Sequence, residues 1–201
     1  MATRFLPMSL TPRKRPAQHR SKAMVDAIVE AAARILESAG LDALTTNAVA
    51  MRAGVSIGSL YQYYPGKESI LAELLRRERE QLLRAIAHLS SNPGASLADD
   101  LHALVRVAVE HQLQRARLAR VLEYVETILP MNQETSDLAR SIVARVAGLL
   151  KRYGRTDVEA GDVVAMAKGM IDAAGLAGET DQDALRERVA RAVFGYLGLP
   201  I

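Results

Sequence analysis

The sequence contains no cysteine among its 201 residues. This absence excludes disulfide bonds, thiolate metal sites and cysteine nucleophiles, and it fits a reducing cytoplasm. No apolar stretch approaches the roughly 18 residues that a membrane span needs. The first 22 residues also lack the apolar core of a secretory signal, because the stretch from Phe5 to Leu10 is short and is broken by Pro7. These absences predict a cytoplasmic protein without a membrane partner.

The pattern of a β-strand is missing as well. Nowhere do β-branched or aromatic residues alternate with period two over a useful length. Apolar residues instead recur every three or four positions, and at 49% of the chain they can fill a substantial core. The predicted helices cover about 22–39, 46–53, 57–63, 67–89, 97–115, 117–129, 133–153, 158–177 and 181–197. We therefore expect an all-α fold.

Acidic residues are absent from residues 1–22, which hold six lysines and arginines. Residues 1–86 hold 13 basic and 8 acidic residues, whereas 87–201 hold 13 and 15. Positive charge gathered at one end favours a polyanionic partner, although a solvated basic tail has the same composition. Three prolines make residues 1–21 a poor helix, so we expect a flexible basic arm there.

Residues 45–67 have the pattern of two short helices joined by a tight turn. Thr45 and Ser56 are residue types that cap helix N-termini, and Gly54 between them tolerates a left-handed backbone. This order is typical of a helix-turn-helix, in which two helices pack at a steep angle. Leu60 and Tyr64 are four residues apart, so we expect both to face the core.

The other side of the second short helix carries small, hydroxyl, amide and aromatic groups and no acid. Such a surface can enter the DNA major groove, where side chains read base edges and bind phosphates. Gln62 can pair with adenine, Ile57 can contact a thymine methyl, and the hydroxyls of Tyr61 and Tyr63 can reach phosphates. Lys67 adds charge at the start of the next helix.

The run from Leu44 to Leu74 resembles the DNA-binding signature of the TetR-type (TetR/AcrR) transcriptional regulators. It has the Thr-Thr pair, the Ala-Gly-Val-Ser turn, the Gly-x-Leu-Tyr helix and the Lys-Glu pair at the family's spacing, with Tyr64 in the usual place of Phe. Counting the helix before it, the resemblance covers about 50 residues. Residues 95–201 resemble the family only in their helical architecture.

This resemblance implies a three-helix DNA-binding domain at 22–66 and an effector-binding and dimerisation domain at 67–201, with 67–89 as the linking helix. It implies a repressor that binds a double-stranded DNA operator as a homodimer and that an unknown small molecule releases. The dimer would form through the helices at 158–177 and 181–197, with Met170 and Val193 at its seam. The apolar rows of these helices would otherwise fill the core of a single subunit.

Two sets of candidate site residues follow from the residue chemistry and the resemblance. The expected DNA-binding residues are Arg13, Lys14, Arg15, Thr46, Asn47, Ser56, Ile57, Gly58, Ser59, Tyr61, Gln62, Tyr63 and Lys67. The expected ligand-binding residues, polar or soft groups within apolar helices, are His111, Glu123, Tyr124 and Met170.

Other functions fit the sequence less well. Gly54 to Gly58 matches the G-x-S-x-G elbow of hydrolases, but that motif needs a preceding strand, and Ser56 is more simply a helix cap. The four histidines lack metal-ligand spacing, so we expect no metal, no cofactor and no enzymatic activity. A DNA-binding architectural protein without an effector remains the alternative to a ligand-responsive repressor.

Overall fold

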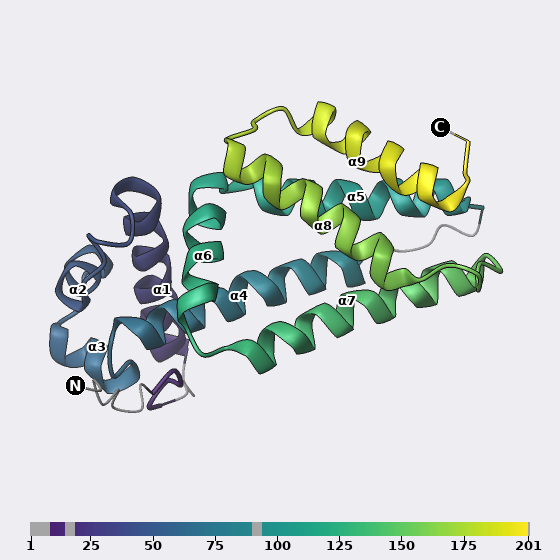
Figure 1. Ribbon diagram of the computed structural model, residues 1–201. Helices are drawn as coiled ribbons and strands as arrows, with labels where there is room; N and C mark the ends of the chain where they lie inside the picture. The colour runs from purple at the N-terminus through teal and green to yellow at the C-terminus, as the bar shows by residue number, and fades with distance from the viewer. Residues whose placement is uncertain (1–8, 15–18, 90–93, 201) are drawn as a thin grey trace, which may run out of the picture. The chain divides into compact units, whose positions relative to one another are not determined.

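The computed structural model describes residues 9–14, 19–89 and 94–200, and within these ranges every regular element is a helix (Figure 1). The helices are α1 (His19–Ala39), α2 (Thr46–Ala53), α3 (Ile57–Tyr63), α4 (Lys67–Ala87), α5 (Leu97–Gln114), α6 (Ala116–Ile128), α7 (Asn132–Arg152), α8 (Ala160–Ala177) and α9 (Gln182–Leu197). The predicted all-α class is confirmed. Among the described helices, none is both long and apolar enough to cross a membrane.

Most predicted helix ends lie within two residues of the observed ones, because they were placed at caps and breakers. The exception is the start of α1, which begins at His19 rather than at residue 22. The first residues of α1 are polar, and apolar periodicity could not detect them. Part of the predicted arm, residues 19–21, is therefore helix, and residues 15–18 and 1–8 lie outside the described part of the chain.

The chain divides into two compact units, residues 1–78 with 121–131, and residues 79–120 with 132–201. The division falls inside α4 and α6 rather than at the start of α4, where the sequence placed the domain boundary. Each of these two helices therefore contributes residues to both units. Residues 67–78 of α4 belong with the helix-turn-helix.

In the first unit, α1 packs against α2 and α2 against α3. The apolar positions of α1 that recur at helical spacing are buried, and α4 and α6 add further buried residues. The side chains concerned include Ile28, Ala32, Leu36, Val49, Leu60, Ile70, Leu71, Leu74, Leu122 and Val125. This core holds the two short helices of the turn in place.

The second unit has its own core, formed where α5, α7, α8 and α9 pack together. Val163, Ile171, Val189 and Val193 are all buried in it, and Met170 packs half-buried against it. The prediction that Val193 lies at a dimer seam is therefore wrong. On these amphipathic helices the apolar row faces the core of the same subunit, since that core is where it is best removed from water.

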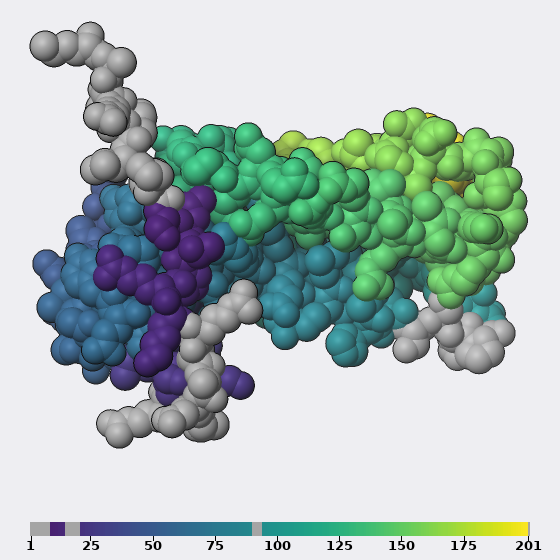
Figure 2. Space-filling model, turned by 90° about the horizontal axis from the view of Figure 1, so that it is seen from below, coloured from purple at the N-terminus to yellow at the C-terminus, as the bar shows by residue number. Residues whose placement is uncertain are grey.

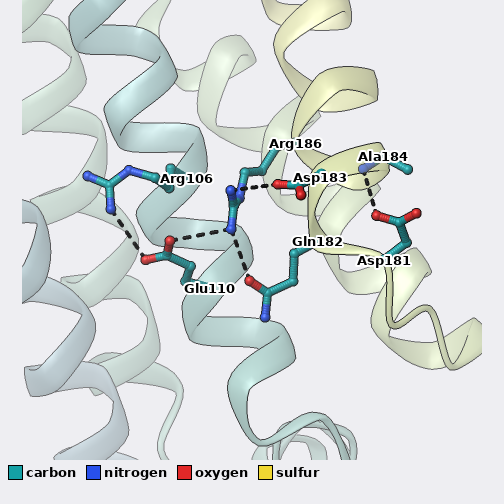
Figure 3. A network of polar contacts seen from close by, with 7 residues as sticks. All are labelled: Arg106, Glu110, Asp181, Gln182, Asp183, Ala184 and Arg186. Carbon is teal, nitrogen blue, oxygen red and sulfur yellow. Dashed lines mark hydrogen bonds and ion pairs between the residues drawn. The ribbon is translucent and has the colours of Figure 1, made fainter.

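A chain of polar contacts links α5 to α9 in the second unit (Figure 3). Glu110 of α5 binds Arg106 at 3.5 Å and Arg186 of α9 at 3.4 Å. The Arg186 guanidinium also donates to the Asp183 carboxylate at 2.8 Å and to the Gln182 amide oxygen at 3.0 Å. Pairs with partners this exposed add little stability, so the packing of α9 against α5 depends mainly on the buried apolar residues of the two helices.

Tyr64 leaves one polar atom without a partner in the core of the first unit. Its side chain is fully buried, and its hydroxyl oxygen has no hydrogen bond. Burial, with a smaller contribution from Glu73, raises the pKa of Tyr64 well above its ordinary value, so the hydroxyl stays protonated. A buried hydroxyl that makes no hydrogen bond costs stability, because it has given up its bonds to water.

We therefore predict that Tyr64→Phe stabilises the protein by about 1 kcal/mol, which is the order of the desolvation penalty removed. Urea unfolding would show a higher midpoint with an unchanged slope. Tyr153→Phe is the matched control, because the single proton of the Tyr153 hydroxyl is shared between the Ala95 carbonyl at 2.9 Å and the Asp100 carboxylate at 3.0 Å. That variant is expected to lose stability, and a lower midpoint for Tyr64→Phe would contradict the interpretation.

Candidate nucleic-acid interface

Local backbone bonding determines where the two short helices begin and end. The Thr45 hydroxyl accepts the amide hydrogen bond of Ala48 at 3.1 Å and so begins α2. Gly54 ends α2 in a left-handed conformation with φ of 68°, which glycine adopts without the steric cost of a Cβ atom. The Ser56 hydroxyl then accepts the amide hydrogen bond of Ser59 at 3.0 Å and begins α3. The predicted caps are confirmed.

The inner side of α3 is larger than the sequence indicated. Leu60 and Tyr64 are buried as expected, but Tyr63 is also buried, with only 7% of its surface exposed. The expectation that Tyr63 projects outward with Tyr61 is wrong. Tyr63 lies three positions after Leu60 within α3, so the two side chains share one helix face, and the inward direction of Tyr63 follows helical periodicity.

The outer side of α3 is open to solvent. Ile57, Gly58, Tyr61 and Gln62 are exposed, with 38% of Ile57 and 41% of Tyr61 accessible. Ser59 is half-buried and shares a hydrogen bond of 2.8 Å with the Ser56 hydroxyl. Both serines are thus engaged in starting the helix, which leaves Ile57, Gly58, Tyr61 and Gln62 as the exposed residues of this side.

Tyr61 is tied to α2 through its side chain. Its hydroxyl shares a hydrogen bond of 3.1 Å with the Thr46 hydroxyl at the start of α2. Asn47 beside it is exposed, as is Lys67 at the start of α4. The structure thus gives Tyr61 a fixed direction at the edge of the exposed surface, whereas Lys67 and Asn47 offer free polar groups.

Two exposed residues of α2 were not singled out by the sequence pattern. Met51 is the most exposed large apolar side chain in the described chain, at 81%, and Arg52 is an exposed cation in the last turn of α2. The sequence signal that could have identified Met51 is an apolar residue on the polar side of an amphipathic helix, shortly before the turn at Gly54. Both are candidates for contacts with the same partner as α3.

The basic arm is only partly described. Arg13 and Lys14 are exposed, while Arg15 lies outside the described residues. The backbone amide of Arg13 donates to the Tyr63 carbonyl at 2.7 Å, and its guanidinium donates to the Tyr61 carbonyl at 3.3 Å. Arg13 is thereby bonded to the end of α3, a contact that the expectation of a flexible arm did not include.

The four expected ligand-binding residues are divided between the two units. His111 and Met170, both half-buried, belong to the second unit, whereas Glu123 and the 59% exposed Tyr124 belong to the first. Burial lowers the pKa of His111, so its imidazole is neutral at pH 7. Within the described ranges, no group of three or more acidic or histidine side chains is placed to hold a metal ion.

Comparison with known proteins gives one matching family model, described as bacterial regulatory proteins of the tetR family, over residues 28–74. The chain is 30% identical over 189 residues to the uncharacterised HTH-type transcriptional regulator Rv2250c of Mycobacterium tuberculosis, covering 85% of this chain and 92% of that protein. It is 31% identical over 150 residues to the HTH-type transcriptional repressor DrrR1 of Streptomyces coeruleorubidus. That alignment covers 73% of this chain but only 50% of DrrR1.

Two further similarities bear on function and fold. The nucleoid occlusion factor SlmA of Vibrio vulnificus is 28% identical over 166 residues, covering 65% of this chain and 83% of SlmA. The crystal structure of a tetR-family regulatory protein from Rhodococcus RHA1 matches with a TM-score of 0.73 at 19% identity, covering 89% of this chain and 98% of that one. At that identity the structural match establishes the fold alone.

Proposed function

The chain belongs to the TetR family of DNA-binding transcriptional regulators, and we propose that it is a repressor that a small-molecule effector releases from its operator. The observation that carries this proposal is the outer side of α3, which is exposed, free of acid and held between capped ends. It has the size and the chemistry that a major groove accepts. Because the target is operator DNA, we expect the protein to act in the cytoplasm.

We assign distinct roles to the exposed residues. The Gln62 amide reads a base edge, Ile57 contacts a thymine methyl, and Tyr61 and Lys67 bind phosphates. Gly58 lies between the two base readers, and a Cβ atom there would meet nothing closer than the Ser56 hydroxyl at 3.9 Å. The missing side chain therefore leaves space for close approach of DNA without being required by the fold.

Regulators of this family act as dimers, and we propose that this chain pairs through the outer sides of α8 and α9. Ala165, Gly169 and Ala173 form an exposed row of small residues on α8, four positions apart. Tyr196 of α9 is 45% exposed and donates to Asp162 of α8 at 2.9 Å, so the exposed sides of the two helices adjoin. Small residues let a second pair of helices approach closely.

Effector release would use the helices that the two units share. Both α4 and α6 contribute residues to each unit, so a rearrangement of helices in the second unit can be passed to the first. An effector that binds one arrangement more tightly shifts the population toward it. In a dimer this changes the separation of the two α3 helices from the roughly 34 Å that adjacent major grooves require.

SlmA supports a second candidate, a DNA-binding factor that acts on the nucleoid without a small-molecule effector. A repressor with an effector is expected to raise its melting temperature in a thermal-shift screen with at least one small molecule, and the same molecule should release it from DNA. If no compound does both, while DNA alone raises the melting temperature, the architectural function is favoured.

We predict separate effects for the residues of α3 and α4 on a duplex selected from random double-stranded DNA by the wild-type protein. Gln62→Ala should change the base preference at one position by about 1–3 kcal/mol. Lys67→Ala should weaken binding to all sequences and lower the slope of log affinity against log salt by about 0.9 for each phosphate that is no longer neutralised. Gly58→Ala should leave the melting temperature unchanged or higher but weaken binding.

Lys151→Ala is the matched control for charge, because Lys151 is an exposed lysine in the last turn of α7, in the second unit. Fluorescence anisotropy at several salt concentrations measures the DNA affinity of all four variants and its dependence on salt. If Lys67→Ala and Lys151→Ala behave alike, the proposed docking of α3 and α4 on DNA is wrong.

For the dimer, we predict that Gly169→Arg produces a folded monomer, since the new charge would be buried without a partner in the seam. A Cβ atom at Gly169 meets nothing within 4 Å beyond the neighbouring backbone of its own helix, so we expect the subunit to accept a side chain there. Gly148→Arg on α7 is the matched control, because Gly148 is equally open and exposed. Sedimentation that gives the same mass for both variants would exclude α8 from the seam.

A further inference from the structure

The C-terminal end of α3 needs hydrogen-bond donors that the helix itself does not have. A helix of seven residues leaves its last carbonyls without intrahelical partners, and here only the Leu60 carbonyl is bonded by the cap residue Tyr64. The last turn also lacks a basic residue to offset the partial negative charge of a helix C-terminus. The carbonyls of Tyr61 and Tyr63 therefore bond to a donor outside the helix, either water or another part of the chain.

Arg13 supplies that donor twice. Its backbone amide donates to the Tyr63 carbonyl at 2.7 Å, and its guanidinium donates to the Tyr61 carbonyl at 3.3 Å. The two bonds come from different parts of one residue, 48 positions before Tyr61 in the sequence. A cation placed at the carbonyl end of a helix also interacts favourably with the helix dipole.

The segment that carries Arg13 is itself anchored. Arg76 of α4 donates to the Leu10 carbonyl at 2.9 Å, and Leu10 and Pro12 are half-buried. Pro12 restricts the backbone directly before Arg13, which lowers the entropy lost when the segment is held. In Figure 1 this segment is the short purple stretch at the end of the first unit where α3 lies, and Figure 2 shows purple atoms of the first described residues over the blue of that unit.

Tyr61, which is bonded through its hydroxyl to Thr46 and through its carbonyl to Arg13, lies directly before Gln62, the expected base reader. Helices this short fray at their ends unless tertiary contacts hold them. We propose that residues 10–13 form a brace, with Arg13 as a positioning residue that fixes the C-terminal end of α3 and so sharpens base discrimination by Gln62. This inference rests on the proposed role of α3 in reading DNA.

A direct phosphate contact by Arg13 is the competing role, and the two bonds of Arg13 allow the roles to be separated. Arg13→Pro removes the amide donor as well as the charge, whereas Arg13→Ala removes the charge and the guanidinium but keeps the amide bond to Tyr63. Arg76→Gln loosens the anchor at Leu10 without altering Arg13. A phosphate contact predicts equal effects for the two Arg13 variants and no effect for Arg76→Gln. The brace predicts a larger loss of discrimination for Arg13→Pro than for Arg13→Ala, and a loss for Arg76→Gln as well.

The test uses the full-length protein and a duplex selected from random double-stranded DNA by the wild type, together with point variants of that duplex. Discrimination is the affinity ratio between the selected duplex and the variant changed at the base pair that Gln62→Ala identifies. We expect Arg13→Pro to reduce this ratio about fivefold, the size of a missing helix cap, and Arg76→Gln to reduce it in the same direction. The amides of residues 60–64 should exchange hydrogen faster in both variants.

Unchanged discrimination in Arg13→Pro, in a protein for which Gln62→Ala does change base preference, would overturn the brace and leave the proposed function intact. An identical flattening of the salt slope in Arg13→Pro and Arg13→Ala, with discrimination and exchange unchanged, would assign Arg13 to phosphate instead. If Gln62→Ala changes no base preference, the assignment of α3 as the reading helix fails and the brace fails with it. Arg13→Lys, which keeps the charge and the amide, should restore discrimination.

Discussion

The short length of α3 is the constraint on which the rest of the first unit depends. Seven residues form too few internal hydrogen bonds to hold a helix, so neighbouring groups must supply the remainder. Ser56 bonds its first turn, Arg13 bonds its last carbonyls, and Thr46 holds the Tyr61 hydroxyl. The helices around α3 serve to present one short helix in a fixed orientation, which is what reading base edges requires.

The buried side chains that anchor α3 include one that lowers the stability of the protein. Leu60, Tyr63 and Tyr64 are all directed into the core, so three large side chains at this end anchor the helix. The hydroxyl of Tyr64 is buried there without a partner, at a cost that phenylalanine would avoid. What remains outside is a narrow acid-free strip with Gly58 and Gln62, and its composition suits a polyanionic partner.

The second unit is built on a separate principle. Its core is large and apolar and is complete within one subunit, with Val163, Val189 and Val193 buried in it. The exposed side of α8, with its small residues, takes no part in that core. Since α4 and α6 have residues in both units, the division of the chain does not follow the ends of helices.

The sequence alone determined the all-α class, nearly all helix ends and the turn, because Thr45, Gly54 and Ser56 act on backbone groups within a few residues of themselves. It also identified the family signature, whose residues are contiguous. Only the tertiary structure decided that Val193 faces the core of its own subunit, because periodicity shows that a face is apolar but not what that face packs against. The bond from Arg13 to Tyr61 was equally out of reach, since no local pattern links a residue to a carbonyl 48 positions away.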